Sequence, residues 1–270
     1  MTRCRFVLII LATWALGPTH VAHAQLAAST SLPPLEAPRD DTSALDGLGG
    51  SGPAETPASA SAPTQGSSGG TDYRGAIGDS IRLLLIQHAV RVSTQDKTRR
   101  ALTGPFFSDY RRSVAMPLQW GDTDSGMTNY VLHPGQGAAS GFIWLQNSAG
   151  GEMPFALTAD YMSSRLWATL WALGYSLQFE IGPFSEASIG NVGMRRETTG
   201  WVDHVITPAG GLAIMMFEDM LDRYVVRKLE DRTDSPVLRA MMRMFLTPSR
   251  ATANVSGMRA PWYRAGRPVG

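Results

Sequence analysis

A long stretch near the start of the chain limits folding to the residues that follow it. Residues 25–72 contain no aromatic side chain, are dense in Pro, Ala, Ser, Gly and Thr, and carry six acids against one base. Such a composition cannot bury enough apolar surface to offset the entropy lost when a chain becomes ordered. We therefore predict a disordered linker over residues 25–72 and one folded domain over residues 73–270.

The residues before this linker are typical of an export signal. Two arginines precede an apolar run over residues 6–16, and an Ala-His-Ala cleavage pattern follows at residues 22–24. We predict a signal peptide over residues 1–24 and a mature protein in the periplasm or at an envelope membrane of a bacterium. The only cysteine, Cys4, lies within this signal, so we expect no thiol catalysis.

The folded part predicts an all-α domain. Trp167, Trp171 and Tyr175 recur every four residues on one face of a helix that we expect Ser163 or Ser164 to cap. No alternating run is long enough to suggest a sandwich or barrel. We expect a compact bundle of about five to six short, largely buried helices. The other helices are predicted over residues 81–92, 106–114, 210–229 and 235–246.

Contact with a membrane is expected at its surface. The best spanning candidate, residues 166–179, is shorter than the roughly 20 apolar residues that a bilayer requires. Residues 223–267 carry ten bases and three acids, with aromatic residues near the end, and such a segment can lie on anionic lipid. A solvated helix face and a polar tail are the plainer interpretation of the same residues. Because export separates the chain from nucleic acid, we expect no nucleic-acid partner.

The first of three polar constellations lies around a His-Pro step. Asn129 precedes His133 and Pro134. Because proline disfavours helical backbone in the residue before it, we expect His133 to end an extended segment, with a closely packed helix after it. A histidine at such a junction can act as a base, a ligand or a capping donor. A structural junction without chemistry is the alternative.

The second constellation places an acid on each side of a Gly-Pro break. Glu180 ends the aromatic helix, where partial burial would suit its carboxyl to general acid–base chemistry. Glu186 lies beyond the break and can approach Glu180 or His133. An exposed loop acid or a helix cap is the plainer interpretation of Glu186.

The third constellation begins at Asp203. Adjacent side chains usually diverge, so we expect Asp203 to pair with the distant His133 rather than with its neighbour His204. Thr207 and Pro208 are predicted to cap and open the helix over residues 210–229.

Small and acidic residues follow within that predicted helix. Gly210 and Gly211 come first, and Glu218 lies farther along. We expect Asp219 to form an ion pair with Arg223, four residues away.

No local motif assigns a metal or a cofactor to these residues. Their spacing fits neither an HExxH nor an EF-hand pattern, and no GxSxG, P-loop or dinucleotide-binding motif occurs in the right context. We therefore predict no metal and no cofactor.

In their order along the chain, the three constellations resemble an uncharacterised family, a domain-of-unknown-function group of exported bacterial envelope proteins. The resemblance covers about residues 120–225 and is interrupted by extra residues between 189 and 201. It implies an envelope location and no known activity. The residues that carry it are Asn129, His133, Pro134, Glu180, Glu186, Asp203, Thr207, Pro208, Gly210, Gly211 and Glu218.

Two hypotheses about function follow. The favoured one is a non-enzymatic, membrane-associated or scaffolding module of the envelope, in which His133, Glu180 and Asp203 form a buried polar network that fixes the helices. The alternative is a hydrolase that acts on a lipid or cell-wall substrate, with His133 as the base and Glu180 or Asp203 orienting it.

Overall fold

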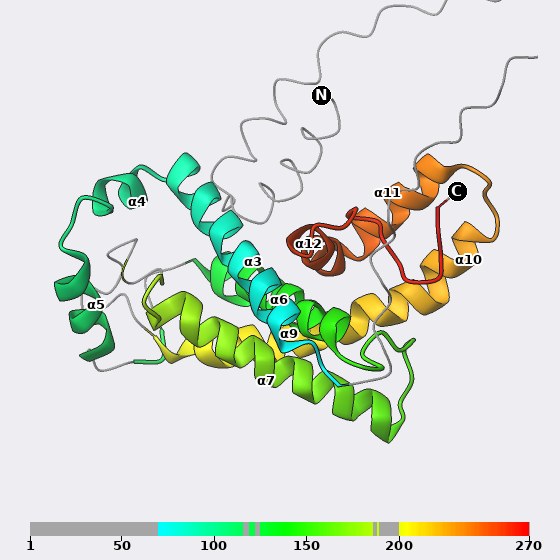
Figure 1. The fold of residues 1–270 in the computed structure, drawn as a ribbon, viewed down its shortest axis with the longest axis horizontal. Coiled ribbons are helices and arrows are strands. Elements are labelled where there is room, and N and C mark those ends of the chain that lie inside the picture. Colours follow the sequence, from blue (N-terminus) through cyan, green and yellow to red (C-terminus); the bar gives the residue numbers. More distant parts are fainter. Residues whose placement is uncertain (1–69, 116–118, 122–124, 186–187, 189–199, 270) are drawn as a thin grey trace, which may run out of the picture.

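The computed structural model describes residues 70–115, 119–121, 125–185, 188 and 200–269. Within these ranges the chain forms eight continuous helices and no strand, which confirms the all-α prediction. Figure 1 shows α3, α7, α9 and α12 around α6, with α4 and α5 at one end of the molecule and α10 and α11 at the other. The predicted signal peptide, residues 25–69 of the predicted linker and Glu186 lie outside the described residues.

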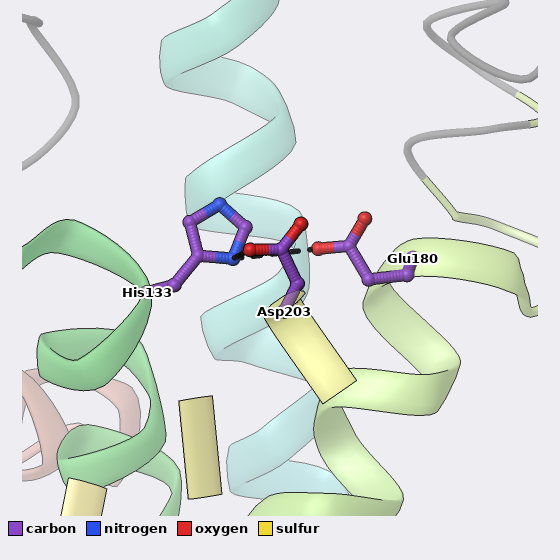
Figure 2. Close-up of side chains that lie close together, drawn as sticks. All are labelled: His133, Glu180 and Asp203. Carbon is purple, nitrogen blue, oxygen red and sulfur yellow. Dashed lines mark ion pairs between the residues drawn. The ribbon is translucent and has the colours of Figure 1, made fainter. Parts of the chain in front are cut away.

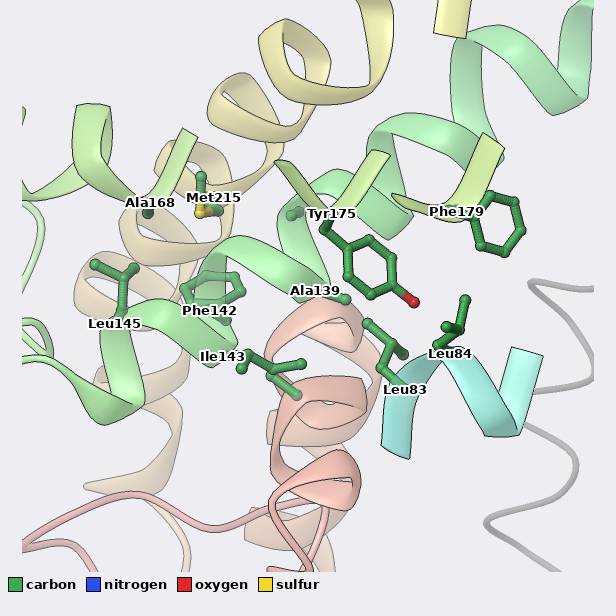
Figure 3. Packing of buried hydrophobic residues seen from close by; sticks show 12 residues of the cluster. Leu83, Leu84, Ala139, Phe142, Ile143, Leu145, Ala168, Tyr175, Phe179 and Met215 are labelled. Atoms are coloured by element: carbon green, nitrogen blue, oxygen red, sulfur yellow. The ribbon is translucent and has the colours of Figure 1, made fainter. Parts of the chain in front are cut away.

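The centre of the fold is a three-helix layer of α6 (His133–Asn147), α7 (Ala159–Ile181) and α9 (Trp201–Leu221), which contact one another pairwise. Figure 3 shows the apolar side chains that fill the space between these helices and α3. These side chains include Phe142, Ile143, Phe179 and Met215, each at most 4% exposed. Their removal from water supplies the main drive for packing.

The surrounding helices cover and extend this layer. Helices α3 (Tyr73–Thr94) and α12 (Pro248–Ser256) both pack on α6. Helix α9 continues through a π-helical turn, η3 (Asp222–Val226), into α10 (Arg227–Glu230). A short connection then leads back into α11 (Pro236–Leu246), so that α10 and α11 form a helical hairpin (Figure 1). Two shorter helices, α4 (Asp96–Ala101) and α5 (Phe106–Ala115), follow α3.

Two predicted helices agree closely with the structure, while three begin earlier than expected. Helices α5 and α11 match residues 106–114 and 235–246 within one residue, and the Ser235 side chain caps α11 as its position suggested. Helix α3 begins at Tyr73, because the Asp72 carboxylate accepts the N–H of Gly75. Helix α7 begins at Ala159, capped by Thr158 rather than by Ser163 or Ser164.

The third early start changes the role of two motif residues. Helix α9 begins at Trp201, so Thr207 and Pro208 lie inside it and the prediction that they cap and open a helix is wrong. The prediction of an extended His133 is also wrong. This residue is helical (φ −63°, ψ −45°) and joins the π-helical turn η1 (Thr128–Leu132) to α6. Tertiary packing overrides the local preference in both places.

None of the helices within the described ranges combines the length and the apolar character needed to cross a lipid bilayer.

Candidate functional site

Three helices bring His133, Glu180 and Asp203 together, as Figure 2 shows. His133 is the first residue of α6, Glu180 lies one residue before the end of α7, and Asp203 lies in the first turn of α9. The His133 Nδ1 atom is 3.3 Å from Asp203 Oδ1 and 3.6 Å from Glu180 Oε1. The side chains are 7%, 5% and 15% exposed for His133, Asp203 and Glu180 respectively. We call these three residues the His133 cluster.

An aromatic wall borders the His133 cluster. The Phe179 ring stands edge-on to the His133 imidazole, with the ring centres 6.4 Å apart, and its other contacts are stacked rings of Tyr175 and His88. The Ser176 hydroxyl donates to the backbone carbonyl of Asp203 across α7 and α9. The packed rings and the buried hydrogen bond hold these helix ends together. The three side chains of the His133 cluster are therefore positioned by helices rather than by loops.

The separation of the cluster residues depends on how closely α6 and α9 cross. A Cβ atom on Gly137 would lie 2.0 Å from the carbonyl oxygen of Thr207, and one on Gly211 would lie 2.7 Å from the carbonyl carbon of Gly137. Only hydrogen at both positions lets the two backbones approach this far. Gly210 similarly lies against the Pro134 ring. The motif residues Pro134, Thr207, Gly210 and Gly211 therefore belong to a helix crossing, with Pro134 directly after His133 and the other three one turn or more beyond Asp203.

Two other motif residues lie at different places. Asn129 is buried in the π-helical turn that leads into His133. Glu218 lies farther along α9, where its two carboxylate oxygens accept the backbone N–H groups of Ser249 and Arg250 at 2.8 and 3.0 Å. Those groups belong to the first turn of α12, whose N-terminal N–H groups lack partners within their own helix. Glu218 thus anchors α12 to α9 and has no place in the His133 cluster.

Burial sets the protonation of Glu218. Desolvation raises the pKa of its carboxyl to about 7, because it outweighs the hydrogen bonds from Ser249 and Arg250. At a pH between the two pKa values, such a carboxyl is still protonated in the folded state but already ionised in the unfolded chain. Its contribution to stability is complete below the unfolded pKa and declines as the pH rises toward 7.

We expect this titration to appear in the pH dependence of unfolding. Between about pH 4.5 and pH 7, Glu218 should lower the free energy of unfolding by about 3 kcal/mol. Glu218→Gln removes the titrating group, so its free energy of unfolding should depend less on pH across this range. Urea unfolding at several pH values measures both curves, with the exposed Asp231→Asn as the control. Parallel curves for the wild type and Glu218→Gln would contradict the assignment.

A buried network of arginines and acids is the largest feature that the sequence analysis missed. Asp219 accepts from the Tyr161 hydroxyl and from Arg165 Nε, both at 2.8 Å, and it also pairs with Arg250. The predicted pair of Asp219 with Arg223 is wrong, because Asp219 faces inward while Arg223 donates to the carbonyl of Phe155. The partners come from α7, α9 and α12, so no local spacing in the sequence signals the network.

A second buried network uses bases from the C-terminal part of the chain. Arg267 donates to both carboxylate oxygens of Asp222 at 2.6 and 2.7 Å, and Arg243 donates to Glu230 at 2.5 Å. Burial raises the pKa of Asp222, but Arg264 and Arg267 outweigh this effect and hold it below its ordinary value. Of the ten bases in residues 223–267, Arg243, Arg250 and Arg264 are buried in these networks. They serve the interior of the domain, so the basic segment is less available to a partner than its composition suggested.

The His133 cluster offers two kinds of chemistry. An imidazole oriented by a carboxylate can accept and return a proton, and an imidazole with two carboxylates can bind a metal ion. Its three side chains each place one ligand-type atom within 4.8 Å of the others. The adjacent His204 is not part of this group. It lies against Trp201, and burial lowers the pKa of its imidazole.

Comparison of the chain with protein-family models, with curated proteins and with solved structures found no match.

Proposed function

We propose that the chain is an exported bacterial envelope protein whose helical domain is a non-enzymatic, membrane-associated module. Support for export comes from the sequence of residues 1–24, with its two arginines, short apolar run and Ala-His-Ala pattern. The likeness of the motifs to exported envelope proteins of unknown activity points in the same direction. In this proposal the linker over residues 25–72 separates the export signal from the folded domain.

The observation that carries the membrane proposal is the exposed apolar face of α11. Val237, Leu238, Met241 and Phe245 lie on successive turns and are 46–68% exposed. A short helix of this kind can lie in the plane of a bilayer surface with its apolar side among the acyl chains. The fold thus offers lipid an amphipathic helix, which the composition of the segment alone did not identify.

Bases next to this helix give the surface its expected preference for anionic lipid. Arg227, Lys228 and Arg232 are exposed on α10 and the turn after it, directly before α11. Each exposed base near an anionic surface contributes about 1 kcal/mol of attraction, which salt screens. We therefore assign the proposed contact to the α10–α11 hairpin, residues 227–246, rather than to the whole of residues 223–267.

A vesicle flotation experiment tests the membrane proposal. We expect the protein to float with phosphatidylglycerol vesicles at low salt, and to float much less with phosphatidylcholine vesicles or at high salt. Lys228→Gln with Arg232→Gln should weaken binding by up to about 30-fold, from two lost attractions of about 1 kcal/mol each. Phe245→Ser should also weaken it, because it removes an apolar contact with the acyl chains.

The control for this experiment is Phe107→Ser, which removes a phenylalanine from α5 that is more exposed than Phe245 and lies outside the hairpin. It should float like the wild type. A wild type that stays at the bottom of the gradient with every vesicle composition would end the membrane proposal. Equal losses in Phe107→Ser and Phe245→Ser would show that the hairpin has no special role.

The geometry of His133 and Asp203 favours a second candidate function, a hydrolase acting on a lipid or cell-wall substrate. A carboxylate at 3.3 Å from one imidazole nitrogen is the arrangement that orients a general base. In the module proposal the same contact serves to fix three helix ends.

Substitution of the histidine separates the two candidates. We expect His133→Gln to lower the free energy of unfolding by about 1–3 kcal/mol, because it loosens a buried polar network. Thermal unfolding and a cellular phenotype of the gene, measured on the same variant, decide the question. If stability is unchanged while the phenotype is lost, the hydrolase proposal replaces the module proposal.

A further inference from the structure

We propose that the His133 cluster is a binding site for one Zn²⁺ ion, or for a transition metal of the same class, which joins the ends of α6, α7 and α9. The ligand atoms are His133 Nδ1 and one carboxylate oxygen each from Glu180 and Asp203. This inference is independent of the membrane contact, because none of the three residues belongs to the α10–α11 hairpin.

The distances within the cluster agree with the edges of a zinc coordination tetrahedron. Zinc binds imidazole nitrogen and carboxylate oxygen at about 2.0–2.2 Å, which places two ligands of a tetrahedron about 3.4 Å apart. The His133 nitrogen lies 3.3 Å from the Asp203 oxygen and 3.6 Å from the Glu180 oxygen. Figure 2 shows both carboxylates directed at the same ring nitrogen. Both carboxylate oxygens therefore lie at ligand–ligand distances from this nitrogen, and all three atoms lie within 4.8 Å of one another.

The types of side chain in the cluster suit a divalent cation. Two carboxylates and one imidazole lie together here, contributed by three helices. A divalent transition metal binds carboxylates in their ionised form and imidazole in its neutral form.

The chemistry of the ligands selects the class of metal. Ca²⁺ and Mg²⁺ prefer oxygen ligands, so the imidazole nitrogen of His133 disfavours both ions. Among the divalent transition metals, zinc combines high affinity with a preference for tetrahedral sites of nitrogen and oxygen. Three protein ligands on regular helices leave a fourth position, which we expect a water molecule to fill.

No sequence motif signals this site, and the reason is topological. Zinc motifs such as HExxH place two ligands on successive turns of one helix. Here the ligands are separated by 47 and 23 positions in the chain and meet only because α6, α7 and α9 pack together. No local spacing of ligands occurs at these residues, which is why the sequence predicted no metal.

Metal loading of the full chain tests the proposal. The protein is stripped with a chelator and then loaded with zinc sulfate alone, and bound metal is counted by mass spectrometry. We expect one Zn²⁺ per chain and a higher thermal unfolding temperature in the loaded protein. X-ray absorption of the wild type should show one imidazole among oxygen ligands and no sulfur, which separates this site from binding by Cys4.

Matched variants locate the bound ion. Glu180→Gln and Asp203→Asn keep the shape of each side chain and remove its charge, and each should lower the affinity for zinc at least about tenfold. His204→Gln is the control, because it changes a histidine next to Asp203 that lies outside the cluster. It should bind zinc like the wild type. Circular dichroism establishes that each variant is helical before metal is added.

Three results would overturn the proposal. The first is a folded wild type that takes up no zinc, and the second is unchanged affinity in both Glu180→Gln and Asp203→Asn. The third is a sulfur ligand or several imidazoles in the X-ray absorption spectrum of the wild type. This result does not depend on whether the variants fold. Vesicle flotation is read separately, so loss of the zinc site and loss of the membrane contact are distinguishable.

Discussion

Asp219→Ala should lower the free energy of unfolding by about 3–5 kcal/mol, the largest effect that we expect from any single substitution in the chain. The Asp219 side chain is 1% exposed and pairs with both Arg165 and Arg250. Alanine leaves two guanidinium groups in the interior without their shared carboxylate. The cost of a buried, uncompensated charge exceeds that of a lost surface ion pair several-fold.

Urea unfolding followed by circular dichroism measures this effect. Asp231→Ala is the control, since it removes an exposed acid from the turn after α10 and should change stability by less than about 0.5 kcal/mol. An Asp219→Ala variant as stable as this control would show that solvent reaches the two arginines.

Gly137→Ala should lower stability by about 1–3 kcal/mol, although alanine is the better helix former. The added methyl group would lie 2.0 Å from the Thr207 carbonyl oxygen, which belongs to the backbone of α9 and can yield only if the helix moves. The same movement would separate His133 from Asp203. We therefore expect zinc binding, where present, to weaken together with stability.

Gly174→Ala is the matched comparison on α7. A Cβ atom there meets nothing within 4 Å. The substitution should therefore stabilise the protein by up to about 1 kcal/mol through helix propensity alone. Thermal and urea unfolding of the two variants give the contrast. Equal and small effects at both positions would mean that α6 and α9 do not cross as closely as the structure shows.

The parts of the fold that the sequence predicted well are those with local signals. Helix α11 begins at a Ser-Pro pair, in which serine caps the helix and proline fits its first turn. Helix α5 likewise follows Pro105. Helix α6 also has a proline, Pro134, in its first turn, and a helix after His133 was expected. Its bounds were not predicted, because Gly, Ala and Ser make much of its buried surface and leave little hydrophobic periodicity.

The sequence identified the residues of the candidate site, but not the arrangement of helices that brings them together. The expectation that Asp203 approaches His133 instead of His204 agrees with the structure, because adjacent side chains on a helix diverge. Glu180 joins them through the packing of α7. Thr207, Gly210, Gly211 and Glu218, which were expected to be structural rather than catalytic, lie outside the cluster. The start of α9 was predicted nine residues too late, so the capping role expected of Thr207 was wrong.

The last residues of the chain pair with acids in its middle. Folding of the domain can therefore be completed only after these last residues have been made. Asp222 and Glu230 lie at the end of the long α9–α10 helix, and Arg264 and Arg267 face them from the C-terminal segment. A chain that has formed α6, α7 and α9 without its C-terminal segment still lacks the two arginines that pair with Asp222 and Glu230 in the final structure. The domain therefore reaches its final state only after its last residues emerge, so a shortened chain should remain exposed to proteases.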